Sequence, residues 1–405
     1  MRLLSLVFLV FSLQTLDTFA SSIDAIVTSF KTDFRKQLVE NNIPGGAYAI
    51  IRDGEVIAME GVGIRALGSK DIVDKNTVFR LASVSKTFAA GLAAQLVEEK
   101  KFSWDDKVID YIPEFRFKSK KYTSNLTVNH IMSQSSSLVH NAYDNLIEAN
   151  YSMPKIIDKF KDIDPMCGLG KCYGYQNVLY SLIQPVIERS TKSSYIDLMH
   201  NHIFDPLEME RSSLGYEAFL ETPNHAEPHV LTRKGWVKTK VKPSYYNVLP
   251  AAGVNASVED MSKWMLAQMG AFPETYSPDV IKMVTEKRIR TLKEMRKRSW
   301  SSVLQNAHYG YGWRIYDIGG GELIYHGGSV AGFRSEVAYS MEKGLALVIL
   351  LNAETRMGSE LNSKFWTKVF REKPKPKIIK TSRKILKVNS SIIPRDKPAS
   401  ILTSK

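Results

Sequence analysis

Hydrophobic residues recur at two different spacings along this chain, and the change of spacing separates helices from strands. Apolar residues three and four positions apart predict an amphipathic helix over 23–41, which ends before Pro44. Apolar runs over 47–52 and 55–62 predict two strands, and Asp53-Gly54 between them is a pair favoured in two-residue hairpin turns. The chain therefore begins with a helix and an antiparallel hairpin.

Strand and helix patterns alternate again near the far end, whereas the middle of the chain shows helical pieces and long loops. Strands are predicted over 309–318, 322–326, 334–340 and 346–351, and helices over 257–269, 278–298 and 359–370. We therefore predict an α+β (α/β) fold with an antiparallel sheet flanked by helices. Its α/β part comes from residues 21–100 and 300–372, and a mostly helical lobe of about 101–299 is inserted.

The run from Thr87 to Val97 is rich in Ala and Leu without Pro, which predicts a buried helix. We expect Ser83 in its first turn, at the positive end of the helix dipole. Lys86 follows three residues later and lies on the same helical face. A desolvated lysine can take the proton of a serine hydroxyl. This Ser-x-x-Lys pair is therefore the first candidate for catalysis.

Two further segments carry candidate chemistry. In Tyr175-Gln176-Asn177, the tyrosine can act as a phenolate base near a lysine, and the asparagine can hydrogen-bond a substrate amide. In His326-Gly327-Gly328-Ser329, the paired glycines let a substrate backbone lie close to a strand that ends there. The N–H of Ser329 could then face an oxyanion.

Each motif is weak alone, because similar spacings occur elsewhere. Ser-x-x-Lys also occurs at 152–155 and 340–343, and Tyr-x-Asn at 143–145 and 245–247. The segment 327–331 nearly matches the Gly-x-Ser-x-Gly elbow, but no histidine follows His326, as that chemistry requires. His225 and His229 have a metal-pair spacing that Pro228 interrupts. We predict no metal and no cofactor.

Charge and the chain ends change the picture in three places. The net charge is +13, and residues 373–405 hold ten Lys or Arg against Asp396, or +9. We interpret this Pro-punctuated tail as a solvated segment that could contact anionic surfaces. The remaining body is nearly balanced, which disfavours nucleic acid as a partner. Residues 1–20 have the pattern of a signal peptide, with an uncleaved anchor as the alternative, so we expect export to the periplasm or outside the cell.

Cys167 and Cys172 are the only two cysteines, and they could pair across a short loop in an oxidising compartment. Two free thiols remain the alternative, because the sequence does not report the distance between them.

Taken in order, the motifs resemble the serine β-lactamase and penicillin-binding-protein superfamily, specifically the class C-like β-lactamase-related family. The segment 79–88, Phe-Arg-Leu-Ala-Ser-Val-Ser-Lys-Thr-Phe, is similar to the family's nucleophile segment. Further similar segments, in family order, lie at 203–209, 251–254, 309–313 and 326–333. The resemblance implies a β-lactamase-like, transpeptidase-like fold.

The resemblance also implies roles for single residues. Ser83 would be the acylated nucleophile, Lys86 and Tyr175 the proton-transfer pair, and Asn177 the group that orients the substrate. The backbone N–H groups of Ser83 and Ser329 would form the oxyanion hole. The expected function is an exported serine hydrolase acting on an amide or ester: a β-lactam, a D-Ala peptide of the cell wall or a small acyl ester. The alternative is a non-catalytic penicillin- or peptidoglycan-binding protein that keeps the fold.

This sequence departs from the family pattern at two places. His326-Gly327-Gly328 stands where class C enzymes have Lys-Thr-Gly, which replaces a cation and a hydroxyl by an imidazole and no side chain. If this imidazole meets the substrate, we expect its charge to change near neutral pH. Gln134 and Ser136 stand where the family usually has His and Gly.

Overall fold

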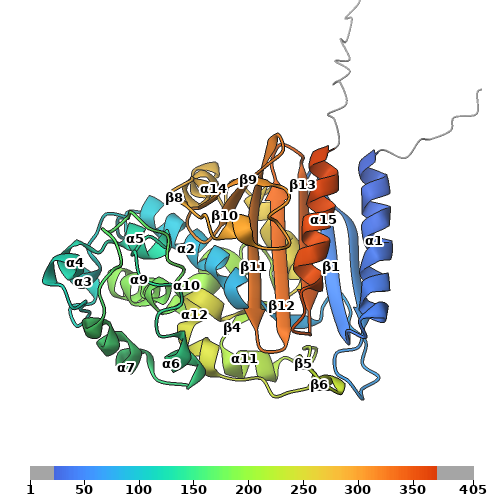
Figure 1. Cartoon of the computed structure of the whole chain (residues 1–405), viewed down its shortest axis with the longest axis horizontal. Helices are drawn as coiled ribbons and strands as arrows, with labels where there is room; N and C mark the ends of the chain where they lie inside the picture. Colours follow the sequence, from blue (N-terminus) through green and yellow to red (C-terminus); the bar gives the residue numbers. More distant parts are fainter. Residues whose placement is uncertain (1–21, 372–405) are drawn as a thin grey trace, which may run out of the picture. The chain divides into compact units, whose positions relative to one another are not determined.

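An eight-stranded antiparallel sheet brings the two ends of the described chain together (Figure 1). This computed structural model describes residues 22–371, and the strand order is β2-β1-β13-β12-β11-β10-β9-β8. The strands are β1 (Gly45–Arg52), β2 (Glu55–Gly63), β8 (Ile289–Arg290), β9 (Leu304–Tyr309), β10 (Arg314–Ile318), β11 (Gly321–Val330), β12 (Phe333–Ser340) and β13 (Leu345–Leu351). The predicted fold class is confirmed, because the first hairpin pairs directly with the last strand, Gly46 opposite Leu351.

The turn between β1 and β2 is the one that the sequence predicts. Asp53 has φ 50° and Gly54 has φ 86°, and Arg52 pairs with Glu55 across them. Two successive residues with positive φ are typical of the type I′ turn, whose twist matches that of the flanking strands.

The sheet separates two hydrophobic cores, and alternate residues of β1 show both. Tyr48 and Ile50 belong to the smaller core, against α1 (Ser22–Glu40) and α15 (Met357–Arg371). Ala47 and Ala49 belong to the larger core, which also contains residues of α2 (Ser85–Glu98) and α13 (Val258–Gln268). Because both faces of the strand are buried, its sequence is apolar without alternation. In Figure 1, α1 and α15 lie beside one another on the outer side of the sheet.

The inserted part of the chain is built mainly from short helices. They are α3 (Val108–Tyr111), α4 (Lys120–Asn125), α5 (Val128–Met132), α6 (Asp144–Glu148), α7 (Met153–Asp158), α8 (Val178–Ser181), α9 (Ile183–Thr191), α10 (Tyr195–Met199), α11 (Tyr216–Glu221), α12 (Leu249–Ala252) and α14 (Pro278–Thr285). Short 3₁₀-helices are η1 (Ala82–Val84), η2 (Lys159–Asp162), η4 (Ser244–Val248) and η5 (Glu294–Arg296), and η3 (His200–Phe204) is a short π-helix.

Two small sheets lie among these helices, although the sequence shows few strand signals there. One has the order β3-β7-β4, and the other pairs β5 with β6. Their strands are β3 (Val78–Arg80), β4 (Ser213–Leu214), β5 (His229–Thr232), β6 (Gly235–Lys238) and β7 (Val254–Ser257). Strands this short pair with distant residues, so local periodicity does not reveal them.

Two predicted elements are wrong. The helix over 278–298 ends at Thr285, because the following residues pair with β9: the N–H of Arg288 donates to Tyr309 O at 3.0 Å. The single strand over 309–318 is two strands, β9 and β10, separated by a turn in which Gly312 has φ 70°. The strand predicted over 322–326 is present but longer, since β11 continues through Gly327 and Gly328 to Val330.

The predicted signal peptide at 1–20 and the basic tail at 373–405 lie outside the described residues, so their roles and the domain limits stay predictions. Between residues 22 and 371, no helix is both long and apolar enough to cross a membrane.

Candidate active site

Ser83 lies on η1, directly before α2, rather than in the first turn of α2 as expected. The turn is buried at Ala82 and Val84, whereas Ser83 is partly exposed. Ala82 has φ 49°, a strained conformation for a residue with a Cβ, and such strain is concentrated at functional sites. A hydrogen bond of 2.6 Å from Ser335 Oγ to Leu81 O ties the turn to β12. The hydroxyl of Ser83 is therefore presented on a rigid support.

Lys86 is fully buried in the first turn of α2. Its Nζ donates to Asn177 Oδ1 at 2.6 Å and to Ala251 O at 3.0 Å. Burial holds the pKa of Lys86 well below its usual range, an effect that Asp144 opposes and Arg314 reinforces. A neutral amine that donates its two N–H groups to these acceptors keeps its lone pair free, so Lys86 can act as a base.

Tyr175 completes the group. Burial raises the pKa of its phenol to about 12, while Arg314 and a hydrogen bond with Ser83 oppose the rise. The Nζ of Lys86 lies 4.7 Å from the centroid of the Tyr175 ring. The structure thus brings Ser83, Lys86, Tyr175 and Asn177 together from separate segments. A protonated phenol beside a neutral amine suits proton donation by Tyr175 and proton abstraction by Lys86.

Gln134 fixes the segment that carries Tyr175 and Asn177. Its Oε1 accepts from the N–H of Gln176 at 2.6 Å, and its Nε2 donates to Gln176 O at 3.1 Å. A Cβ on Gly174 would lie 2.0 Å from Leu138 O, so only glycine fits there. The departure at position 134 therefore has a structural role, since the glutamine side chain pairs with both backbone groups of Gln176.

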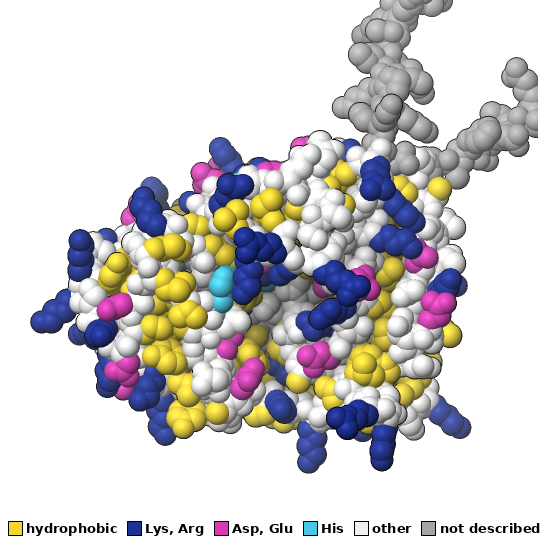
Figure 2. All heavy atoms as spheres, viewed as in Figure 1, with side chains coloured by type: hydrophobic (Ala, Val, Ile, Leu, Met, Phe, Trp, Pro, Cys, Tyr) yellow, Lys and Arg dark blue, Asp and Glu magenta, His cyan; other side chains and the backbone are white. Residues whose placement is uncertain are grey.

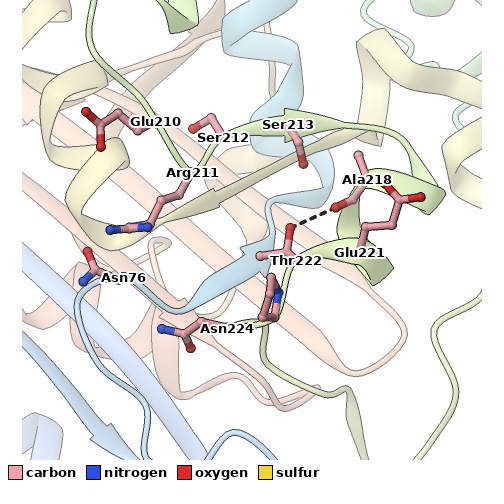
Figure 3. Close-up of a pocket in the computed structure, with 10 residues that line it drawn as sticks. Asn76, Glu210, Arg211, Ser212, Ser213, Ala218, Glu221, Thr222 and Asn224 are labelled. Atoms are coloured by element: carbon pink, nitrogen blue, oxygen red, sulfur yellow. Dashed lines mark hydrogen bonds between the residues drawn. The ribbon is translucent and has the colours of Figure 1, made fainter.

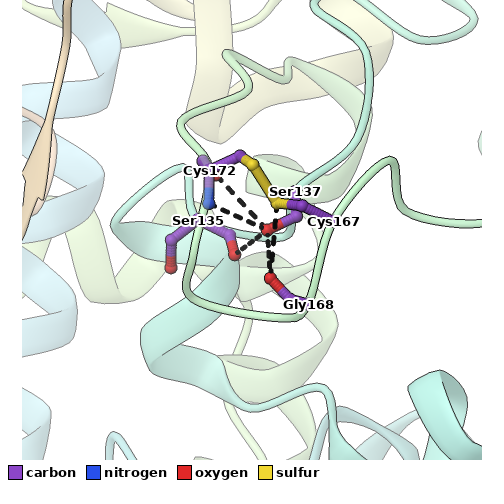
Figure 4. The surroundings of a disulfide bond; sticks show 5 residues. All are labelled: Ser135, Ser137, Cys167, Gly168 and Cys172. Carbon is purple, nitrogen blue, oxygen red and sulfur yellow. Dashed lines mark hydrogen bonds between the residues drawn. A yellow bond between two sulfur atoms is a disulfide. The ribbon is translucent and has the colours of Figure 1, made fainter.

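Cys167 and Cys172 form a disulfide just before this segment (Figure 4). The loop that they close is bonded to Ser137, whose Oγ donates to Gly168 O at 2.8 Å and accepts from the N–H of Cys172 at 3.3 Å. Of the two alternatives that the sequence leaves open, the structure has the bridge.

β11 lies against the turn that carries Ser83. A Cβ on Gly328 would lie 2.2 Å from Leu81 O and 2.2 Å from Ser335 Oγ, so the close approach requires glycine. The next residue, Ser329, is exposed. The backbone N–H groups of Ser83 and Ser329 thus belong to adjoining elements, and their role as an oxyanion hole stays a prediction.

The expectation that His326 titrates near neutral pH against the substrate is wrong. The imidazole is fully buried in β11, with Nε2 3.3 Å from Tyr309 Oη and Nδ1 3.0 Å from Gly327 O. Burial and the nearby charges of Arg314, Lys86 and Lys297 hold the pKa of His326 well below its usual range. Burial and these charges therefore disfavour protonation of His326, and its imidazole is not exposed to a substrate.

Several cations that no sequence motif indicates lie beside Gly327. A pocket of about 230 Å³ is lined by these residues: Lys297, Ser299, Trp300, Arg314, Tyr325, Gly327, Gly328, Ser329, Arg334, Glu336 and Ser359. Figure 2 shows Lys and Arg side chains on both sides of a hollow in this face of the molecule. A Cβ on Gly327 would lie 2.6 Å from Tyr325 Oη, which donates to Glu336 at 2.7 Å. The Tyr325–Glu336 pair thus lies immediately beside the position where class C enzymes have a threonine side chain.

A larger pocket of about 530 Å³ lies elsewhere, and most of its lining comes from residues 210–224 (Figure 3). None of the predicted catalytic residues lines it. His225 and His229 form no metal pair. The ring of His229 is buried, with Nε2 accepting from the N–H of Leu67 at 3.0 Å and Nδ1 2.8 Å from Asn352 O. No cluster of three or more metal-ligating side chains occurs in the described range 22–371.

Comparison with known proteins places this geometry in a family. The chain is 21% identical to Protein flp of Staphylococcus aureus strain MW2 over 347 residues, which are 84% of this chain and 66% of that protein. It is 24% identical to a D-aminopeptidase of Gluconobacter oxydans over 348 residues, which are 83% of this chain and 59% of that protein. The chain thus spans less than two thirds of the length of each of these curated relatives.

A solved structure shows the same fold. The octameric penicillin-binding protein homologue from Pyrococcus abyssi matches with a TM-score of 0.74 and 23% identity, over 84% of this chain and 77% of that one. The Beta-lactamase family model matches residues 25–364, a range that contains every predicted site residue. This chain therefore belongs to the Beta-lactamase family.

Proposed function

We propose that this protein is a serine hydrolase that forms an acyl-enzyme on Ser83. The observation that carries the proposal is the buried Lys86, bonded to Asn177 and Ala251, beside a tyrosine that hydrogen-bonds Ser83. Burial of a lysine amine destabilises its charged form and so costs folding free energy. Lysines with a pKa lowered in this way are concentrated at functional sites.

The reaction proceeds in two halves. Lys86 takes the proton of Ser83, whose Oγ attacks the carbonyl carbon of an amide or ester. The bond to the leaving group then breaks, and the leaving nitrogen or oxygen receives a proton from Tyr175, which Lys86 reprotonates. A water molecule next attacks the ester carbonyl of the acyl-enzyme, gives its proton to the same pair and releases the acid. Ser83 recovers its proton, so the protein ends unchanged.

The charges beside Gly327 favour a substrate that carries a carboxylate. Three cations, Lys297, Arg314 and Arg334, line the pocket there. Two acidic residues lie nearby: Glu294, which pairs with Lys297 and Arg314, and Glu336, which lines the same pocket. Electrostatic complementarity of this kind selects anionic ligands. Peptides with a free carboxyl end and β-lactams meet this requirement, whereas a neutral ester does not use the pocket.

Labelling with a fluorophosphonate, followed by peptide mapping, tests the nucleophile. We expect the label on Ser83 in wild type and none in Ser83→Ala. A panel of nitrocefin, short acyl esters, peptides ending in D-Ala and D-amino acid amides then sorts the substrates. The last class is included because a relative is named a D-aminopeptidase. Ligand binding without label or turnover would instead support a non-catalytic binding protein.

We also propose that the protein is exported, on the signal-peptide pattern of residues 1–20. N-terminal sequencing of the protein recovered outside the cytoplasm tests this. A mature chain beginning after residue 20 is expected, and an intact Met1 in the exported protein would contradict cleavage.

A further inference from the structure

Asp144 is joined to the buried lysine through one side chain. Asn177 Nδ2 donates to Asp144 Oδ2 at 2.7 Å, and Asn177 Oδ1 accepts from Lys86 Nζ at 2.6 Å. The carboxamide of Asn177 therefore lies between a carboxylate and an amine, and each of its two ends has a partner. Asp144 begins α6, whereas Lys86 lies in the first turn of α2, so two helices distant in sequence meet through this amide.

We propose that Asp144 is a positioning residue, which fixes the carboxamide of Asn177 and thereby leaves the lone pair of Lys86 directed to Ser83. This inference rests on the proposed roles of Ser83 and Lys86. A carboxylate accepts hydrogen bonds and does not donate them. Asp144 therefore holds the NH₂ end of Asn177, and the oxygen end must face Lys86.

The orientation of this amide matters for the base. If the amide turned over, its NH₂ group would face the Nζ of Lys86 and donate to the amine's lone pair. That lone pair is the acceptor of the Ser83 proton, so the turned amide would compete with the reaction. Lys86 would also lose one of its two acceptors, which leaves Ala251 O alone. Asp144 excludes this arrangement because it cannot donate to the amide oxygen.

Asp144 also acts through its charge. Its second oxygen, Oδ1, is buried and has no hydrogen-bond partner among the described residues. Burial raises the pKa of Asp144, and its bond to Asn177 and the charge of Lys86 oppose the rise. The carboxylate in turn raises the pKa of Lys86, against burial and Arg314. The other titratable groups around the pair are His326 on β11, Tyr175 before α8, Tyr180 on α8, Tyr245 on η4 and Glu148 on α6 itself.

Two substitutions separate orientation from charge. Asp144→Asn keeps an oxygen that can accept from Asn177 but removes the charge, so the pKa of Lys86 falls further. The acidic limb of the kcat/KM profile should move to lower pH by about one unit. Asp144→Ala removes both functions, so the limb should move similarly while kcat also falls by about tenfold or more. Glu148→Gln is the control, because it removes a carboxylate of α6 that does not contact Asn177.

A readout independent of turnover keeps this test separate from that of the proposed function. In protein with ¹³C-labelled lysine, the ε-carbon of Lys86 is assigned by comparison with Lys86→Arg and titrated by NMR. Its midpoint should fall in Asp144→Asn and stay in place in Glu148→Gln, with folding of each variant checked by thermal unfolding. An unchanged midpoint together with an unchanged kcat in folded Asp144→Ala, which removes both functions, would overturn the inference. A shifted midpoint without fluorophosphonate labelling of Ser83 would support it and reject the hydrolase.

Discussion

Two groups of side chains with different electrostatics lie close to Ser83. Lys86, Tyr175 and Asn177 form a buried set, in which we propose that Lys86 and Tyr175 transfer protons, and the pKa of Lys86 is lowered chiefly by burial. Beside Gly327, Arg334 and Glu336 line a pocket whose charge we propose selects the substrate. The first set is what the family pattern predicts. The second lies beside Gly327, where this chain lacks the threonine side chain of class C enzymes.

Glu336 is expected to make the use of anionic substrates depend on pH. Burial raises the pKa of its carboxyl to about 7, against a hydrogen bond from Tyr325. The carboxyl is neutral below this pKa and gains a negative charge above it. The charge then repels a substrate carboxylate, so kcat/KM for an anionic substrate relative to a neutral ester should fall as pH rises through about 7.

Glu336→Gln should remove this fall, because the amide stays neutral and keeps an acceptor for Tyr325. The measurement is the ratio of the two kcat/KM values between pH 5 and 9 in both proteins. Asp317→Asn is a control that neutralises a carboxylate on β10 paired with Lys287 instead. A ratio with the same pH profile in wild type and Glu336→Gln would show that Glu336 does not face the substrate.

At the scale of elements, two loops determine where Tyr175 and Asn177 lie. The segment around Gln134 provides the partner for the backbone of Gln176, and the disulfide loop is bonded to Ser137. Both Gln134 and Ser137 have positive φ, at 59° and 63°. These loops are therefore held by specific hydrogen bonds in addition to packing.

Gln134→Ala should lower both stability and activity. The N–H of Gln176 loses its acceptor in a buried place, which costs about 1–3 kcal/mol. Urea unfolding measures this loss of stability. We expect kcat/KM to fall even under conditions where the variant is fully folded, because Tyr175 is no longer held in place. Gln184→Ala, on α9, removes an amide that bonds Glu188 and should leave kcat/KM unchanged. Equal kcat/KM in wild type and Gln134→Ala would show that the segment positions itself without this residue.

At the scale of the whole molecule, an ion cluster built on the buried Glu294 and Arg314 joins η5 to the sheet. Glu294 Oε2 lies 2.7 Å from Lys297 Nζ and 3.2 Å from Arg314 Nε, and it accepts from Tyr316 Oη at 2.6 Å. Burial alone would raise the pKa of Glu294, but the charges of Arg314 and Lys297 outweigh it and lower the pKa to about 2. The cluster therefore links the stability of the fold to the cations of the pocket.

Because the pKa of Glu294 is lowered in the folded state, we expect the free energy of unfolding to decrease in acid. A carboxyl with a depressed folded pKa stabilises the fold above its unfolded pKa, and this contribution is lost as pH falls through the folded pKa. Between the ordinary value of 4.5 and about 2, the free energy of unfolding should decrease by about 3 kcal/mol through Glu294.

Glu294→Gln should be less stable at pH 7 by about 3 kcal/mol or more, because Arg314 stays buried without its partner. Its stability should also vary less between pH 4.5 and 2 than that of wild type. Denaturant unfolding over this range checks both, with Glu360→Gln on exposed α15 surface as the control. A variant with the acid dependence of wild type would place the acid-sensitive group elsewhere.

The sequence by itself determined the elements whose pattern is local and strong. The helices predicted at 23–41 and 359–370, the hairpin at Asp53-Gly54 and the last two strands follow from periodicity and turn chemistry, and the structure has all of them within two residues at each end. The Ser83–Lys86 pair was singled out by its spacing at the start of a strong helix pattern, although Ser83 itself lies on η1, directly before that helix. Tyr175 and Asn177 needed the resemblance as well, since their motif recurs elsewhere in the chain.

Only the tertiary structure decided the surroundings of these residues. β8 is a strand because β9 lies beside it, although its own sequence favours a helix. The pKa of His326 is lowered because the fold buries its imidazole among cations. Asp144 bonds Asn177 because the fold brings α6 to that side chain. Burial and contacts between distant segments arise when the chain closes on itself. Local periodicity does not predict such contacts. The charged side chains around Ser83 could therefore be identified only from the fold.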